Sequence, residues 1–143
     1  MINQKSILAL LAFMCLTLMI NAQSLVGTWK TIDDESGEPK SHISIYEENG
    51  KFYGKIIKLL PAATGTVCTH CPGDKKGQPI EGMVVLWDLK AYKDYWSYGQ
   101  IMDPATGKVY KASVWVDGND KLSVRGYVGF SLLGRTQTWH KID

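Results

Sequence analysis

Beyond residue 22, the sequence has no sustained helical periodicity and no apolar run long enough to suggest a membrane-spanning helix. It also lacks an excess of basic residues, because the formal net charge is only +2 and no cluster of Lys and Arg is present. No internal repeat or low-complexity tract is visible. These absences argue against a helical fold, against a helical membrane protein and against a nucleic-acid partner.

Motifs for catalysis, cofactors and metals are also scarce. No glycine-rich phosphate loop precedes a helix, and Gly129–Gly134 is one residue too long for a GxSxG nucleophile motif. His42 and His140 have no nucleophile that can be assigned beside them. The carboxylates of Asp33–Glu35 precede Gly37 and Pro39, which is typical of a solvated loop. We therefore expect no catalytic residue, no metal and no cofactor, and an enzyme is the less favoured interpretation.

Met1–Ala22 has the pattern of a signal peptide. Lys5 provides the positive charge, Ile7–Ile20 is almost wholly apolar, and Ala22 is the small residue that precedes the expected cleavage site. Cys15 raises the alternative of a lipid-modified protein. The residue before it is the bulky methionine 14, whereas lipid attachment needs a small residue there. We therefore expect export to the periplasm or the cell exterior, without a membrane span in the mature chain.

Residues 23–143 are expected to form one domain built from antiparallel strands. In Val109–Val116, apolar and polar residues alternate, which is the period of a half-buried strand. We expect the face carrying Tyr110, Ala112, Val114, Leu122 and Val124 to point inward, because the opposite face carries Lys and Arg. Eight strands are expected, at Val26–Ile32, Ser41–Tyr46, Lys51–Leu59, Met83–Trp87, Tyr95–Met102, Lys108–Val116, Lys121–Tyr127 and Gly134–Lys141.

Short turn motifs separate most of these strands. Asn49-Gly50 tolerates positive φ at both central positions of a tight hairpin. In Asp103–Gly107, the aspartate can accept a hydrogen bond from the backbone two residues on, and the glycine supplies a left-handed residue. Asp117–Asp120 has a similar turn sequence and is expected to close the next hairpin. Sequential strands with short turns predict an all-β, up-and-down antiparallel barrel of about eight strands, in which closure removes the exposed edges.

The one long connection, Leu60–Ile80, contains the only two cysteines of the predicted mature chain, Cys68 and Cys71. In an exported protein, a local disulfide is the favoured interpretation of this CxxC pair. A redox-active pair would need a helix beginning at the first cysteine, and this context is missing. A metal site would need further ligands, and His70 lies too close to both cysteines to chelate easily with them.

Two residues near the ends of the domain form a barrel-closing signature. Trp29, in Gly27-Thr28-Trp29, belongs to the first expected strand and Arg135 to the last. This pattern resembles the lipocalin signature, in which the Arg packs over the Trp ring and closes one end of the barrel. A cation–π contact makes such a pair physically sensible. The resemblance therefore implies a Trp29–Arg135 contact.

A wider set of segments resembles one bacterial family across essentially all of residues 25–142. The segments are GTWKT, CTHC, GQIMDPATGKVYKA, KLSVRGYVGF and LGRTQTWHKI. The family is domain of unknown function 2147, and membership implies an exported, lipocalin-like β-barrel. No activity is established for the family, so the resemblance implies no catalytic residues.

Two classes of function remain, both non-enzymatic. The favoured one is a binding module for a small apolar or amphipathic molecule, because an eight-stranded barrel has room for side chains or one small ligand. The candidate ligand-lining residues are Trp87, Trp96, Tyr98, Tyr110 and Trp115. They can equally fill the core or cover the outside, and Tyr110 and Trp115 have opposite parity. The alternative is an envelope protein that binds a protein or glycan through exposed aromatics. A thiol-redox protein using the CxxC pair is a distant third.

Overall fold

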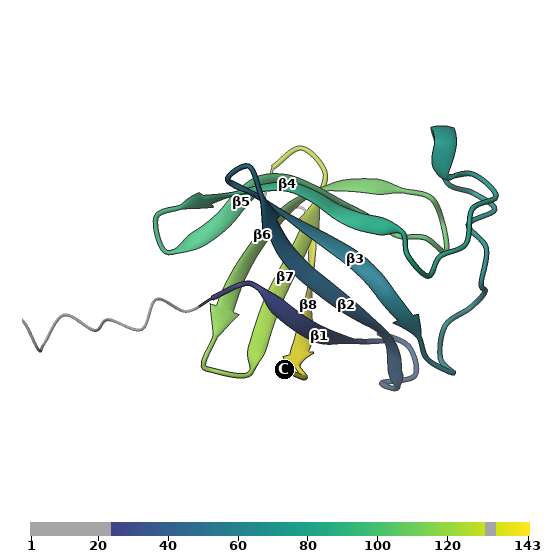
Figure 1. The fold of residues 1–143 in the computed structure, drawn as a ribbon, viewed down its shortest axis with the longest axis horizontal. Helices are drawn as coiled ribbons and strands as arrows, with labels where there is room; N and C mark the ends of the chain where they lie inside the picture. The colour runs from purple at the N-terminus through teal and green to yellow at the C-terminus, as the bar shows by residue number, and fades with distance from the viewer. Residues whose placement is uncertain (1–23, 131–133) are drawn as a thin grey trace, which may run out of the picture.

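The computed structural model describes residues 24–130 and 134–143, so the expected signal peptide lies outside the described residues. The eight strands found there form a closed antiparallel barrel in sequence order, as the turn pattern predicts (Figure 1). The strands are β1 (Gly27–Ile32), β2 (Pro39–Glu48), β3 (Lys51–Leu59), β4 (Val84–Tyr92), β5 (Tyr95–Met102), β6 (Val109–Asp117), β7 (Lys121–Tyr127) and β8 (Gly134–Lys141). The long connection between β3 and β4 projects beyond the barrel and carries the short 3₁₀ helix η2 (Gly73–Lys75).

The strand boundaries match the sequence pattern closely except in β4. This strand runs to Tyr92, five residues beyond the predicted end at Trp87. Asp88 has a φ of 58°, in the left-handed region, so the strand is irregular where the apolar alternation is lost. The strand continues beyond it and pairs with β5, with Lys90 opposite Ser97. Local pattern alone therefore underestimates β4, because its second half is held by pairing.

The interior face is the one predicted from the distribution of charge. Ala112 and Val114 on β6 and Leu122 and Val124 on β7 are all buried, with exposed fractions of 0–3%. Tyr110 follows the same parity and is half-buried. The parity of β6 and β7 thus places these side chains in the interior of the barrel.

The predicted turns form as expected. Asn49 and Gly50 have φ values of 52° and 76°, as the tight turn between β2 and β3 requires. Between β5 and β6, Asp103 Oδ1 accepts a hydrogen bond from Ala105 N at 2.9 Å, and Gly107 has a φ of 72°. These local contacts set the register of the hairpins.

One end of the barrel is closed by Trp29, which is 1% exposed. Its Nε1 donates to the Leu25 carbonyl oxygen at 3.0 Å, and Lys141 Nζ lies 5.6 Å from the ring centroid. The predicted contact between Trp29 and Arg135 is wrong, because the cation near the Trp29 ring belongs to Lys141. Trp29 is opposite Lys141 in the β1–β8 pairing, and Arg135 lies six residues earlier on β8, roughly 20 Å away at strand spacing. Lys141 therefore takes the position over the ring.

The closed end can be tested with two substitutions. Trp29→Phe removes the hydrogen bond to Leu25 and part of a buried ring, so we expect the free energy of unfolding to fall by about 1–3 kcal/mol. Arg135→Lys is expected to change it by less than about 0.5 kcal/mol, because its side chain is exposed. Urea denaturation monitored by circular dichroism measures both values. A larger loss for Arg135→Lys than for Trp29→Phe would contradict this account of the closed end.

Candidate functional site

A cavity of about 750 Å³ occupies the end of the barrel opposite Trp29. In an up-and-down barrel the β1–β2, β3–β4 and β5–β6 connections lie at the same end, and all three contribute to the wall of the cavity. Core residues nearer the closed end, including Ile45, Leu89 and Leu122, are fully buried and do not line it. The barrel is therefore filled in one half and hollow in the other.

The cavity has an apolar interior and a charged rim. The deeper wall is made mainly of buried apolar side chains, namely Ile43, Ile56, Val85, Met102, Val124 and Trp139. Charged side chains of both signs lie at the rim, namely Asp33, Asp34, Glu35, Lys40, Asp103, Lys108 and Arg135. An apolar interior below a charged rim matches the shape and polarity of an amphipathic molecule.

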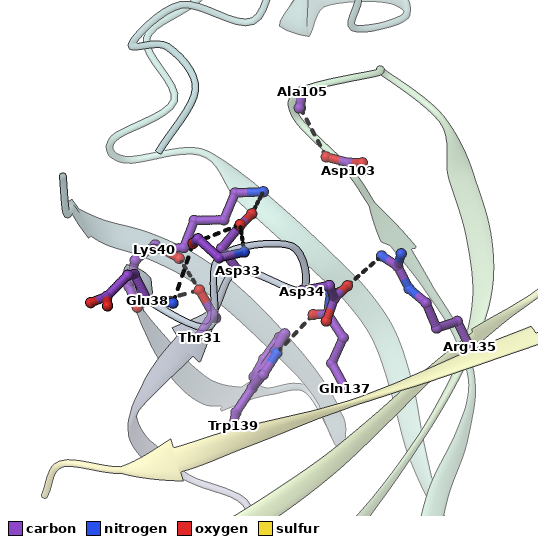
Figure 2. A network of polar contacts seen from close by, with 12 residues as sticks. Thr31, Asp33, Asp34, Glu38, Lys40, Asp103, Ala105, Arg135, Gln137 and Trp139 are labelled. Atoms are coloured by element: carbon purple, nitrogen blue, oxygen red, sulfur yellow. Dashed lines mark hydrogen bonds and ion pairs between the residues drawn. The ribbon is translucent and has the colours of Figure 1, made fainter. Parts of the chain in front are cut away.

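A chain of polar contacts crosses the rim between the β1–β2 connection and β8 (Figure 2). Asp34 Oδ2 accepts from Arg135 Nη2 at 2.7 Å and from Gln137 Nε2 at 2.8 Å. Gln137 Oε1 in turn accepts from Trp139 Nε1 at 3.3 Å. Residues 135, 137 and 139 alternate along one strand and therefore share a face. The chain leads from the charged rim into the apolar interior.

Asp33 organises the neighbouring part of the rim. Its Oδ2 accepts hydrogen bonds from the backbone N and the Oγ of Ser36, both at 2.9 Å, and Lys40 Nζ lies 3.8 Å from Oδ1. The two Ser36 hydrogen bonds, followed by the charge of Lys40, lower the pKa of Asp33 from its ordinary value. Below this loop, Thr31 Oγ1 and Ser41 Oγ are 2.7 Å apart and satisfy each other in the cavity wall.

The β3–β4 connection, residues 60–83, forms one wall of the cavity through residues that include Val67, Thr69 and Ile80. It is ordered by its own backbone hydrogen bonds. Cys68 N donates to Gln78 O at 2.9 Å, Gly77 N to Cys68 O at 2.8 Å, and Ile80 N to Thr66 O at 2.8 Å. This long connection is a built part of the site, as long loops in compact domains often are.

A disulfide joins Cys68 and Cys71, as predicted, and packs this wall against the β5–β6 turn. The two cysteines are 0% and 3% exposed. Cys68 Sγ lies 3.2 Å from the Pro104 carbonyl oxygen, and Cys71 Sγ lies 3.6 Å from Met102 Sδ. A side chain at Gly107 would overlap the His70 carbonyl oxygen, so the turn needs glycine for this contact as well as for its φ. Burial of both sulfurs fits a structural crosslink better than an accessible redox pair.

The family model described as "uncharacterized protein conserved in bacteria", domain of unknown function 2147, matches residues 27–141. The chain belongs to this family. A solved structure from the human pathogen Helicobacter pylori, described as a protein that belongs to the lipocalin family, has a TM-score of 0.74. It is 24% identical, the match covers 84% of each chain, and at this identity it shows the fold alone. A comparison with curated proteins returns no match.

In this member of the domain of unknown function 2147 family, only Tyr110 of the five predicted ligand-lining aromatics contributes to the described cavity wall. Trp87 is held by Gln100 Oε1, which accepts from its Nε1 at 3.1 Å, and by Lys75, 5.2 Å from its ring. Trp96 packs against Phe52, with ring centroids 6.0 Å apart. Trp115 follows the parity opposite to the buried Val114. These rings stabilise the sheet rather than line the cavity.

Tyr98, the remaining candidate, lies in a separate exposed group of aromatic rings. It is 65% exposed and has a φ of 63°, which is an outlier for a bulky residue. The Tyr92 ring packs edge-on against Tyr98 at 5.5 Å and against Tyr95 at 5.3 Å. The register of β5 shifts between Trp96 and Gly99, so an irregularity in pairing turns Tyr98 outward.

The main residue missed by sequence reasoning is Trp139. It is 2% exposed, lines the cavity and donates to Gln137. The available sequence signal was the alternation of Arg135, Gln137 and Trp139 on β8. Because these three residues differ in polarity, the pattern does not identify them as an inward face. Within the described part of the chain, no group of three or more His, Cys, Asp or Glu residues is placed to hold a metal, and no helix is long and apolar enough to span a membrane.

Removal of the disulfide tests its role in the wall. Cys68→Ala/Cys71→Ala is expected to leave the barrel folded and to lower the free energy of unfolding by about 1–2 kcal/mol, because the crosslink closes a very short ring. Alanine avoids the unpaired hydroxyl that serine would bury at these sites. Hydrogen exchange should speed up in residues 60–83 and remain unchanged in β6 and β7. Unchanged exchange in residues 60–83 would contradict a restraining role.

Proposed function

We propose that the protein is an exported, non-enzymatic carrier that holds one small apolar or amphipathic molecule in the open half of its barrel. The observation that carries this proposal is the cavity of about 750 Å³ with a buried apolar wall. Its volume lies within the range of roughly 300–1,000 Å³ that is usual for small-molecule sites. Barrels of this kind commonly enclose such ligands, and the H. pylori structure supports the comparison at the level of fold.

Export is part of the proposal. A disulfide persists in oxidising compartments outside the cytoplasm, and the Cys68–Cys71 bond is consistent with such a location. The signal-peptide pattern of Met1–Ala22 supports the same conclusion. We expect residues 23–143 to function in the periplasm or outside the cell. Intact mass of the exported protein should show the loss of residues 1–22, and retention of a lipid-modified Cys15 would contradict it.

Binding is favoured over catalysis by the positions of reactive side chains. The two cysteines are buried in a disulfide. His42 and His140 neighbour the inward-facing Ser41 and Trp139 on their strands, so both have outward parity. The rim carboxylates of Asp33 and Asp34 are held by ion pairs and hydrogen bonds. This arrangement supports a container with an anchored rim.

The direct experiment is native mass spectrometry of the protein purified from its own cell envelope. We expect an added mass that is lost on denaturation, corresponding to one small molecule for each chain. Purified protein should also bind the apolar fluorophore N-phenyl-1-naphthylamine, with an increase in its emission. Absence of both signals would overturn the proposed function.

A cavity-filling variant assigns the binding to the barrel. Val124→Trp places an indole in the cavity wall and is expected to weaken N-phenyl-1-naphthylamine binding by at least about tenfold, or about 1.4 kcal/mol. Ile57→Trp is the matched control, because Ile57 is 47% exposed on the outside of the barrel and the substitution places the same ring there. Thermal unfolding should show that both variants are folded. Equal binding by the two variants would place the fluorophore elsewhere.

A second candidate function, binding a protein or glycan through exposed aromatics, has one observation in its favour. Tyr98 is held outward in an unfavourable backbone conformation, and such strain often marks functional surfaces. If this surface is used, Tyr98→Ser should reduce retention of the protein on its isolated envelope fraction without changing fluorophore binding. Unchanged retention would indicate that these tyrosines only pack against one another on the surface.

A further inference from the structure

The inward face of β8 changes from charged to apolar as it descends into the cavity. Arg135, Gln137 and Trp139 share this face, and all three line the cavity. Arg135 is 72% exposed at the rim, whereas Trp139 is 2% exposed in the interior. A ligand lying along this face would therefore meet a cation at one end and an apolar surface at the other.

Two donors on this face converge on a single oxygen atom. Arg135 Nη2 and Gln137 Nε2 lie 2.7 Å and 2.8 Å from the same Oδ2 of Asp34. The orientation of the Gln137 amide is fixed from the other side, because its Oε1 accepts from Trp139 Nε1. The amide nitrogen thus faces the rim beside the guanidinium. A guanidinium and an amide donor aimed at one point form a site for a carboxylate or a similar oxyanion.

The carboxylate found in this site belongs to a loop. Asp34 lies in the connection between β1 and β2, and its side chain is 38% exposed. Its neighbour Asp33 contacts Ser36 and Lys40 instead, so the loop keeps its own conformation if the Asp34 side chain moves. Arg135 is itself accessible to solvent and has further N–H donors. An incoming anion can therefore reach the guanidinium and compete with Asp34.

We propose that Arg135 and Gln137 form an anion clamp at the rim, and that the ligand is an anionic amphipathic molecule whose head group displaces the Asp34 carboxylate. In the unliganded protein Asp34 occupies the clamp and keeps Arg135 paired. In the complex the apolar body lies against Met102, Val124 and Trp139, and the head group takes the position of Asp34 Oδ2. This inference rests on the carrier function proposed above and adds the charge of the ligand.

Three probes with chains of matched length but different head groups test the sign of the charge. Each is titrated below its micelle concentration against the protein loaded with N-phenyl-1-naphthylamine, and displacement of the fluorophore gives the affinity. Dodecanoate is expected to bind about tenfold more tightly than dodecanol, because a charge-assisted clamp adds to the same chain burial. Dodecyltrimethylammonium is expected to bind more weakly than dodecanol.

Matched variants then test the clamp. Arg135→Gln is expected to remove the preference for dodecanoate over dodecanol. Asp34→Asn keeps the shape of the competing side chain but removes its charge, so it is expected to tighten dodecanoate binding several-fold. Arg125→Gln is the control, because Arg125 lies on β7 outside the cavity wall, where its Nη1 donates to Thr136 Oγ1. It is expected to behave like the unaltered protein.

The outcomes separate this inference from the proposed function. Equal binding of dodecanoate and dodecanol, or a dodecanoate preference that survives Arg135→Gln, would overturn the clamp and leave the carrier function intact. Preference for dodecyltrimethylammonium would show that the rim carboxylates select a cation and would also overturn it. If neither the fluorophore nor any probe binds, the carrier function fails as well.

Discussion

Every strand of this barrel has a partner on both sides because β1 pairs with β8, and that seam is the shortest in the sheet. Only Trp29 with Lys141 and Lys30 with His140 are in register across it. Two hydrogen bonds beyond β8 extend the seam, from Thr28 N to Asp143 O at 3.0 Å and from Ile142 N to Thr28 O at 2.8 Å. Without this pairing the sheet would expose two edges and its apolar face. The hollow interior therefore depends on a few contacts between the two ends of the domain.

The two ends of the barrel are stabilised in different ways. At the closed end, Trp29 and Leu25 exclude water, and the indole hydrogen bond satisfies a buried donor. At the open end, the long β3–β4 connection must form a wall of the cavity with only the short helix η2 and one isolated β-bridge, between Val67 and Pro79, as regular structure. The disulfide, the contact of His70 with Gly107 and the internal hydrogen bonds of residues 60–83 supply that support. A rigid wall of this kind can hold a cavity open, because the neighbouring side chains do not collapse into it.

The rim combines anchoring contacts with the ligand selection that we propose. Asp33 and Asp34 are adjacent in sequence but differ in use: Asp33 organises its own loop, whereas Asp34 reaches across to β8. The contacts made by Asp34 place a carboxylate beside the only arginine in the described wall of the cavity. Because these groups remain solvent-exposed, their pairing contributes little to stability and can be exchanged at low cost. This separation allows the barrel to stay intact while the rim changes partners.

The eight strands, except the second half of β4, could be predicted from the sequence, as could the turns, the inward face and the cysteine pairing, because each depends on local alternation, turn chemistry or short spacing. The sequence also predicted a tryptophan at the closed end. Tertiary structure decided which cation covers Trp29, since the register between β1 and β8 selects Lys141 and leaves Arg135 at the rim. The tertiary structure also determines which aromatic side chains line the cavity. Irregularities at Asp88 and Tyr98 change which side chains point inward along β4 and β5. An alternating sequence pattern cannot reveal such changes, because they arise only when the strands pair.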